Sequence, residues 1–238
     1  MAKWQVIVRI AGLAVLTSAA CWLGACANEK AQPSGSSDAD ATVEVASVPP
    51  IQGDRVFVPG PWTRVYNVRK AGSERVLEQE RRTASEVGAD GRWQVRFERT
   101  PYGRTDWTLE RTLTMTRTED GIALVKFEDA GRGMAFDFEP ALVLAPSVVN
   151  GQSSDSTKTM QGGDAGEASA TITPLNAVDG NPRVRTTLTL VQGRTRVERV
   201  SELTLGDRGS VLEEIERTVR WAGLRVDHAE EVLEQVGE

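Results

Sequence analysis

Residues 183–221 read RVRTTLTLVQGRTRVERVSELTLGDRGSVLEEIERTVRW. Apolar and polar residues alternate along much of this stretch, where Val184, Leu188 and Leu190 stand among arginines and threonines. Such a period of two is typical of β-strands that bury one face. Gln192-Gly193 interrupts the alternation with a turn signal, as does the glycine-rich segment 206–209. The stretch therefore predicts consecutive antiparallel strands joined by short turns.

The same pattern continues on both sides of this stretch. Trp93, Val95 and Phe97 alternate with polar residues upstream, and Ala222-Gly223 is a turn signal just downstream. No long segment has a convincing helical stripe, although the apolar residues of 211–219 would also line one face of a helix. We therefore predict an all-β fold, an antiparallel sheet that forms a half-barrel or a barrel-like meander. Its last four strands are expected at residues 183–191, 194–205, 211–221 and 224–236.

The predicted all-β domain covers residues 54–238 and follows a segment of different composition. Residues 26–53 are rich in serine, alanine, proline and small acidic residues, which cannot bury a face. We expect this segment to be a flexible tether. Residues 150–167 are rich in glycine, serine and aspartate and are expected to form an exposed loop between two halves of the domain.

The first 25 residues have the layout of an export signal. A short, positively charged start is followed by an apolar run, residues 10–23, that is short for a membrane-spanning helix. The segment Leu23-Gly24-Ala25-Cys26 then resembles the lipobox of bacterial lipoproteins. This resemblance covers only the N-terminal segment. It implies that residues 1–25 are a cleaved signal peptide, and that Cys26 receives a diacylglycerol thioether and an acyl chain, such as palmitate, on its new amino group.

The resemblance also implies where the domain is held. In lipoproteins of this type an aspartate after the cysteine favours the inner membrane, and Ala27 stands in its place here. The implied location is the cell envelope, with a lipid anchor in the outer membrane. Two alternatives are open. Ala25-Cys26-Ala27 also fits an ordinary signal peptidase site, which would give a soluble secreted or periplasmic protein, and the apolar run could be an uncleaved anchor helix.

Charge and residue content exclude several classes of function. Lys3 and Arg9 are the only charged residues before Cys26, which leaves 26 basic and 34 acidic residues and a net charge of about −8. This balance lacks the basic footprint that nucleic-acid binding needs, and it argues against electrostatic docking on anionic lipid. Both cysteines precede the domain, and His228 is its only histidine. We therefore expect no disulfide, no metal, no cofactor and no catalytic activity.

One group of charged residues interrupts the apolar face of the predicted sheet. The turn at 222–223 would place Arg217 opposite His228, and a five-residue turn at 206–210 would place Arg199 opposite Arg217. Two arginines and a histidine inside a half-barrel can hold a carboxylate or phosphate group. Arg199, Arg217 and His228 are therefore the candidate ligand-binding residues.

A purely structural role competes with this interpretation. The charged residues would then pair in water with Glu213 and Glu230 at a part of the sheet beyond the core. A register error of one residue would also separate the cluster, because it moves side chains to the other face. Tryptophans can line a ligand cleft as well, but on alternating strands they are more often core residues, which is our expectation for Trp62, Trp93, Trp107 and Trp221.

These observations favour a membrane-anchored envelope lipoprotein whose domain binds without catalysis. The first hypothesis is an interaction module for an envelope protein or cell-wall component, and a closed, filled sheet interior would favour it. The alternative is a half-barrel carrier or sensor of a small amphipathic or anionic ligand, which a deep apolar cleft with charges at its mouth would favour. An enzyme ranks third, because no triad, phosphate loop or carboxylate cluster can be assembled from the sequence.

Overall fold

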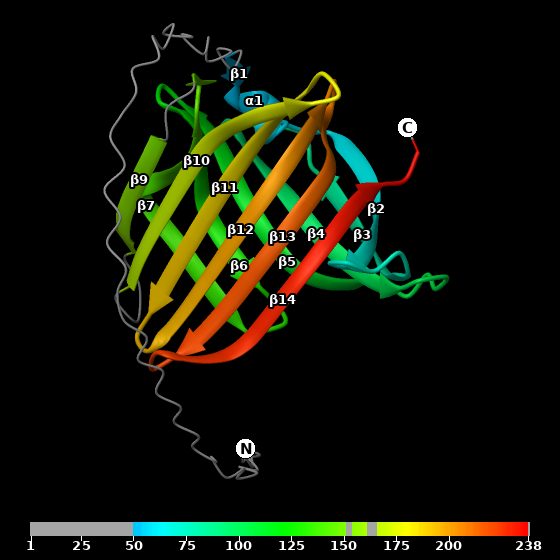
Figure 1. The fold of residues 1–238 in the computed structure, drawn as a ribbon. Helices are drawn as coiled ribbons and strands as arrows, with labels where there is room; N and C mark the ends of the chain where they lie inside the picture. The colour runs from blue at the N-terminus through cyan, green and yellow to red at the C-terminus, as the bar shows by residue number, and fades with distance from the viewer. Residues whose placement is uncertain (1–49, 151–153, 161–165, 238) are drawn as a thin grey trace, which may run out of the picture. The chain divides into compact units, whose positions relative to one another are not determined.

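The computed structural model describes residues 50–150, 154–160 and 166–237 (Figure 1). The predicted signal peptide, the lipobox-like segment and residues 26–49 of the predicted tether lie outside these residues. The end of the predicted tether is not flexible, because Ile51–Gln52 form a strand and Ile51 is 2% exposed. Every described element belongs to one compact unit, Val45–Glu238. Its elements in chain order are β1 (Ile51–Gln52), α1 (Gly53–Val56), β2 (Trp62–Lys70), β3 (Val76–Ala84), β4 (Arg92–Pro101), β5 (Thr108–Thr118), β6 (Gly121–Asp129), β7 (Met134–Pro146), β8 (Val148–Val149), β9 (Ser154–Met160), β10 (Gly166–Val178), β11 (Asn181–Gln192), β12 (Thr195–Gly206), β13 (Gly209–Trp221) and β14 (Leu224–Gln235).

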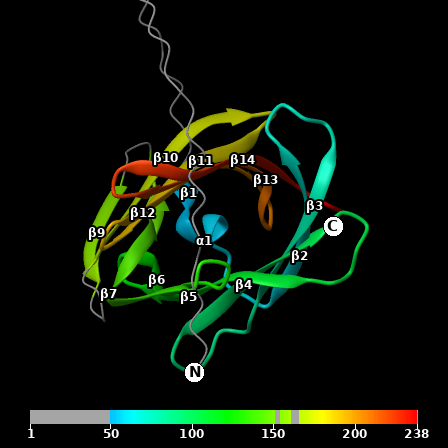
Figure 2. The ribbon, with the colours of Figure 1, turned by 90° about the horizontal axis from the view of Figure 1, so that it is seen from below.

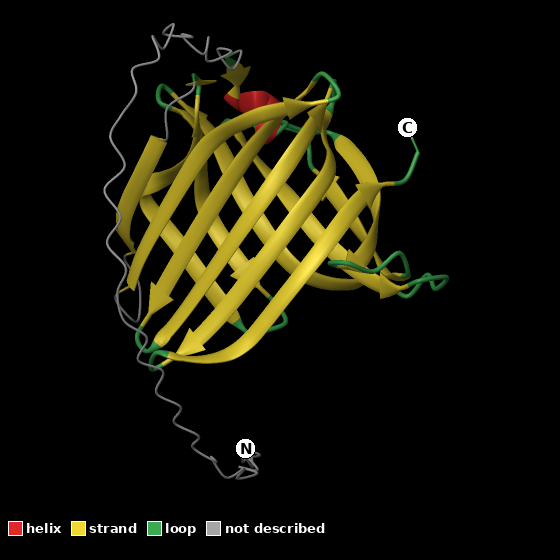
Figure 3. Cartoon of the chain, viewed as in Figure 1, coloured by secondary structure: helices red, strands yellow, loops and turns green. Residues whose placement is uncertain are grey.

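The predicted all-β fold is confirmed, and strands dominate the domain (Figure 3). The last four predicted strands correspond to β11, β12, β13 and β14 within a few residues at each end. Residues 211–219, which also suit a helix, lie within β13. Cross-strand pairing along its whole length explains this outcome, since tertiary context overrides a short helical pattern.

The segment 150–167, predicted as an exposed loop, contains a strand instead. Residues 154–160 form β9, which pairs antiparallel with β10 from Ser154↔Ile172 to Met160↔Gly166. Serine, threonine and lysine dominate β9, so it has no apolar alternation by which it can be recognised. As the last strand of the sheet it needs a partner on only one side, which suits a polar sequence.

Twelve strands form one continuous antiparallel sheet in the order β7-β6-β5-β4-β3-β2-β14-β13-β12-β11-β10-β9. The two strands at the ends of this order, β7 and β9, lie in contact with each other. The sheet therefore curls into a nearly closed, barrel-like form, with β2–β7 on one side and β9–β14 on the other (Figures 1 and 2). Inward-facing side chains from both sides share the interior.

The largest core cluster fills the part of the interior between β4–β7 and β10–β11, and Trp93, Leu124 and Leu142 are among its members. A second cluster lies where β1 and α1 pack at one end of the barrel, with Ile51, Val56 and Leu205 in its centre. In Figure 1 this end is the upper one. Among the described residues, no helix is both long and apolar enough to cross a membrane.

Candidate functional site

Charged side chains occupy the interior of the barrel where an apolar core would be expected. Glu80 and Arg82 project inward from β3, and Glu213 projects inward from β13, and all three are at most 8% exposed. In the sheet, β2 and β14 lie between β3 and β13. The curvature of the sheet brings the inward-facing side chains of β3 and β13 together. A buried charge is costly unless it is paired, so the pairing of these residues decides what the site can do.

Glu80 is the centre of the first set of ion pairs. Its carboxylate accepts hydrogen bonds from Arg82 Nε (2.6 Å) and Arg99 Nε (3.1 Å). Arg99, from β4, also holds Glu231 of β14 through two hydrogen bonds of 2.6 and 3.0 Å. Burial would raise the pKa of Glu80, but the surrounding guanidinium groups of Arg82, Arg111 and Arg99 lower it far below the ordinary range. Glu80 is therefore a permanent anion.

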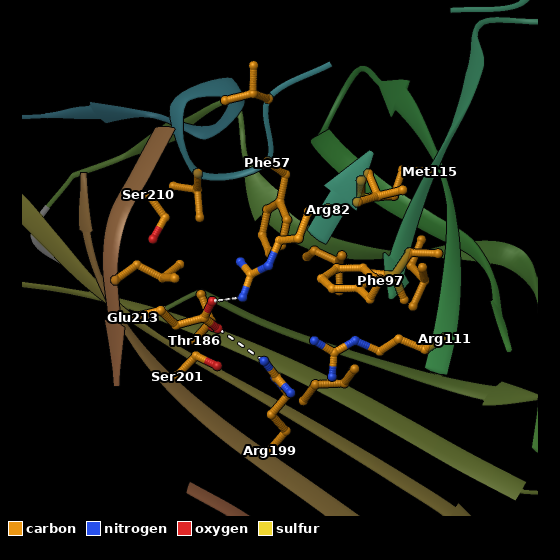
Figure 4. Close-up of a pocket in the computed structure, with 18 of the residues that line it drawn as sticks. Phe57, Arg82, Phe97, Arg111, Met115, Thr186, Arg199, Ser201, Ser210 and Glu213 are labelled. Atoms are coloured by element: carbon orange, nitrogen blue, oxygen red, sulfur yellow. Dashed lines mark hydrogen bonds and ion pairs between the residues drawn. The ribbon is translucent and has the colours of Figure 1, made fainter. Parts of the chain in front are cut away.

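Glu213 is the centre of the second set. It accepts a hydrogen bond from Arg82 Nη2 at 2.5 Å and one from Arg199 Nη2 at 3.2 Å (Figure 4). Burial opposes ionisation of this carboxyl, but Arg82 and Arg199 outweigh that effect and lower its pKa to about 2. Arg82 thus links both carboxylates, and strands far apart in the sequence are joined by charged hydrogen bonds across the interior.

Arg111 of β5 lacks such a partner. Its side chain is 12% exposed, and its nearest carboxylate oxygen among the described residues is Glu80 Oε1, 3.8 Å from Nη2. Its guanidinium lies 4.0 Å from the ring centre of Phe97 and donates no hydrogen bond to a described carboxylate. Burial, with Arg199 close by, lowers the pKa of Arg111. Figure 4 shows Arg111 and Arg199 projecting into the interior from opposite sides.

An apolar cavity of about 140 Å³ lies beside this cluster. Its lining is mostly aliphatic and aromatic, and includes Phe57, Trp62, Phe97, Met115, Leu124 and Phe127. The charged residues on its lining are Arg64, Arg82, Arg111, Arg199 and Glu213, four cations and one anion. Even with Glu80 added, positive charge remains in excess, although the whole chain has a net charge of −6.

A second cavity of about 280 Å³ adjoins the first and shares Arg111, Phe127, Leu188 and Arg199 with it. It extends toward the β6–β7 turn, where Gly131 and Arg132 line it together with Arg217. This is the end of the barrel opposite α1 (Figure 1). The lining of this second cavity also includes Glu110 and Asp129, so its four arginines exceed its carboxylates by two. The interior is therefore apolar at its centre and has an excess of arginine toward one end.

Two of the three predicted site residues come together here. Arg199 and Arg217 are directly opposite each other in the β12–β13 register, as predicted, and both line the second cavity. Arg217 Nη2 donates to Asp227 at 3.2 Å, and Arg217 Nε is buried without a hydrogen-bond partner among the described residues. Arg199 is paired with Glu213 in the interior and not in water at an exposed sheet end.

The predicted position of His228 opposite Arg217 is wrong. The β13–β14 register shifts between Val219 and Arg220, so His228 faces Thr218 and Ala229 faces Arg217. A bulge adds one residue to β14 and moves every later side chain to the other face. His228 therefore points outward, where Nδ1 contacts Thr218 Oγ1 (3.1 Å) and Nε2 contacts Glu230 Oε1 (2.9 Å).

The four tryptophans predicted in the core have different environments. Trp93 is 2% exposed in the main cluster, and Trp62 is half-buried and lines the first cavity. Trp107 is half-buried beneath the guanidinium of Arg81, 4.6 Å from its ring centre. The core prediction is wrong for Trp221, which is 51% exposed because β13 extends beyond the packed interior at its end.

Sequence reasoning missed Glu80, Arg82, Arg99 and Arg111. Both faces of β3 are polar over Val76–Ala84, so alternation does not show which face is buried. A signal exists in the pairing, since Arg82 is opposite Phe97, and Phe97 alternates with Val95 and Trp93 on an apolar face. Once the β3–β4 register is known, that face carries Glu80 and Arg82 inward.

Comparison of the chain with protein-family models, curated protein sequences and solved structures finds no match. What the site can do must therefore be argued from its own geometry. In the described part of the chain, no group of three or more histidine, cysteine, aspartate and glutamate side chains is arranged to hold a metal ion. The described site consists of an apolar cavity with guanidinium groups in its lining, which can bind a ligand that has an apolar part and an anionic group.

Proposed function

We propose that the interior of the barrel binds a small amphipathic anion, with its apolar part in the first cavity and its carboxylate or phosphate between Arg111 and Arg199. The observation that carries this proposal is Arg111, a buried guanidinium without a hydrogen-bonded carboxylate, in the lining of an apolar cavity. The ion pair of Arg111 with Glu80 is 3.8 Å long and has no hydrogen bond, so it compensates only weakly for the burial of the cation, and an anionic ligand would lower that cost.

Charge balance supports the same occupant. Arg82 and Arg199 share Glu213, and Arg82 also shares Glu80 with Arg99, so neither carboxylate is free to neutralise Arg111 fully. Guanidinium groups bind planar carboxylates and phosphates through paired hydrogen bonds. Because the cavity lining around them is mostly apolar, the ligand class is amphipathic and not a free inorganic anion.

The two cavities favour a carrier or sensor of such a ligand over an interaction module, which would use the outer surface alone. A filled interior would have favoured the interaction module, whereas two adjoining cavities with arginines toward one end suit a ligand. The proposed role is non-catalytic. It also includes the lipid anchor that Leu23-Gly24-Ala25-Cys26 implies, which would hold the domain at the envelope membrane.

We expect Arg111→Gln to weaken binding of dodecanoate, a single-chain carboxylate used as the probe. Loss of a charged hydrogen bond costs about 1.5–3 kcal/mol, which corresponds to about 10- to 150-fold in Kd. The empty variant should be as stable as the wild type or slightly more stable, because the repulsion with Arg199 is removed. Titration calorimetry and chemical denaturation of the unit Val45–Glu238 measure the two quantities.

The matched control is Arg96→Gln, which removes an arginine from the exposed face of neighbouring β4. It should leave the affinity for dodecanoate unchanged. Equal affinities of wild type and Arg111→Gln would contradict the proposed site, as would a wild-type domain that does not bind the probe.

A further inference from the structure

We propose that the β13–β14 hairpin is a docking tip for a lipid bilayer that contains anionic phospholipid. This tip consists of Trp221, Leu224 and Val226 together with the arginines around them, and it lies at the lower end of the barrel in Figure 1. The inference goes beyond the proposed function, because it requires neither a ligand in the interior nor the lipid anchor.

The apolar part of the tip is exposed to an unusual degree. Trp221, Leu224 and Val226 are 51%, 69% and 61% exposed, and they cluster around the two-residue turn Ala222-Gly223. Both turn residues have positive φ (48° and 84°), which matches the tight hairpin that projects these side chains. The bulge after Val219 leaves Val226 as the extra residue of β14, outside the pairing of the two strands.

The cationic part of the tip is a row of arginines across three strands. Arg196 is opposite Arg220 in the β12–β13 pair, and Arg220 is opposite Arg225 in the β13–β14 pair. Like charges directly opposite each other destabilise a sheet. Among the described residues Arg196 has an ion pair, with Glu198 at 3.0 Å, whereas Arg220 and Arg225 have none. Such an exposed row of like charges attracts external anions.

A fourth arginine adds to the same end of the barrel. Arg194, in the β11–β12 turn, accepts a hydrogen bond at its backbone oxygen from the amide of Ala222 (2.8 Å). Its side chain is exposed beside the hairpin. The acidic net charge of the chain, which argues against docking on anionic lipid, is therefore not distributed evenly. The local charge at this tip is positive.

A bilayer suits this tip better than a protein partner. Stable protein interfaces bury about 1,200–2,000 Å², far more than three side chains at the end of a hairpin can offer. A bilayer needs only a shallow apolar wedge, because tryptophan is favoured at the headgroup level and each arginine near an anionic surface adds attraction. The tip presents a wedge of this kind with arginines directly behind it.

The test uses co-sedimentation of the unit Val45–Glu238, which contains every core cluster of the described residues, so that the lipid anchor does not contribute. The vesicles contain phosphatidylcholine and phosphatidylglycerol at about three to one, with pure phosphatidylcholine in parallel. The wild-type unit should bind the mixed vesicles, and about 0.5 M salt should weaken that binding at least fivefold. Arg220→Gln with Arg225→Gln should weaken it about tenfold.

A pair of valines gives a matched control. Val226→Asn changes the tip, whereas Val178→Asn changes a 45% exposed valine at the β10–β11 turn, on the opposite end of the barrel. The first should lower the vesicle partition coefficient about threefold or more and the second should leave it unchanged. Equal effects of the two valines, or equal binding to both kinds of vesicle, would overturn the proposal. So would failure of the wild type to sediment with vesicles, including the case in which the tip binds a protein instead. Dodecanoate titration of the same samples tests the proposed function separately, because dodecanoate binding in the absence of vesicle binding would overturn only the docking tip.

Discussion

Replacement of Glu213 by glutamine is expected to destabilise the domain by about 3–5 kcal/mol at neutral pH. Glu213 is 4% exposed and accepts hydrogen bonds from both Arg82 and Arg199. The amide removes the negative charge. Arg82 then keeps Glu80 as its carboxylate partner, whereas Arg199 loses its ion pair among the described residues. Urea denaturation of the wild type and the variant measures this difference in the free energy of unfolding.

The pH dependence of this difference gives a second measurement of the same effect. The pKa of Glu213 is lowered from an ordinary value near 4.5 to about 2 in the folded domain. Its stabilising contribution is therefore complete above pH 4.5 and is lost as the pH falls through about 2. The gap between wild type and Glu213→Gln should close over that interval. Glu198→Gln, on the outer face of β12, should cost no more than about 1 kcal/mol. A small, pH-independent effect of Glu213→Gln would contradict the buried ion-pair network.

Replacement of Cys26 by serine is expected to abolish acyl incorporation and release the protein from membranes. Each buried CH₂ of an acyl chain contributes about 0.8 kcal/mol to attachment, so several chains hold the protein far more firmly than one. Metabolic labelling with a fatty-acid analogue and membrane fractionation measure the two effects.

The control is Cys21→Ser, which should remain acylated and membrane-bound. Leu23 lies three residues before Cys26, whereas no leucine has that position before Cys21. The opposite pattern, with release of Cys21→Ser and retention of Cys26→Ser, would contradict this prediction and place the anchor on Cys21. Retention of both variants in membranes without label would favour an uncleaved anchor helix.

The sequence predicts the strands well where one face is apolar, as in residues 183–221, because period-two alternation is a direct consequence of one-sided burial. It also places Arg199 opposite Arg217 correctly, since no bulge separates that pair from the middle of the β12–β13 ladder. The same counting fails one strand later. A bulge at Val226 leaves no trace in the alternation of polar and apolar residues, and it moves His228 to the outer face.

The buried ion pairs at the centre of the site cannot be predicted from the alternation of polar and apolar residues. Glu80 and Arg82 belong to a strand that is polar on both faces, and their burial depends on contacts with β13, more than a hundred residues away in the chain. The closure of the sheet brings these partners together, and no local pattern encodes it. The exposure of Trp221 has a similar cause, because only the completed barrel shows which part of a strand extends beyond the core.

The most direct measurement of the central claim is native mass spectrometry of the unit Val45–Glu238, produced without residues 1–44 and purified without detergent. The proposed function predicts a retained amphipathic acid at one per domain, displaced by dodecanoate and lost in Arg111→Gln but present in Arg96→Gln. A wild-type domain that remains free of ligand, and that also fails to take up dodecanoate, would contradict the claim that the barrel interior is a ligand site.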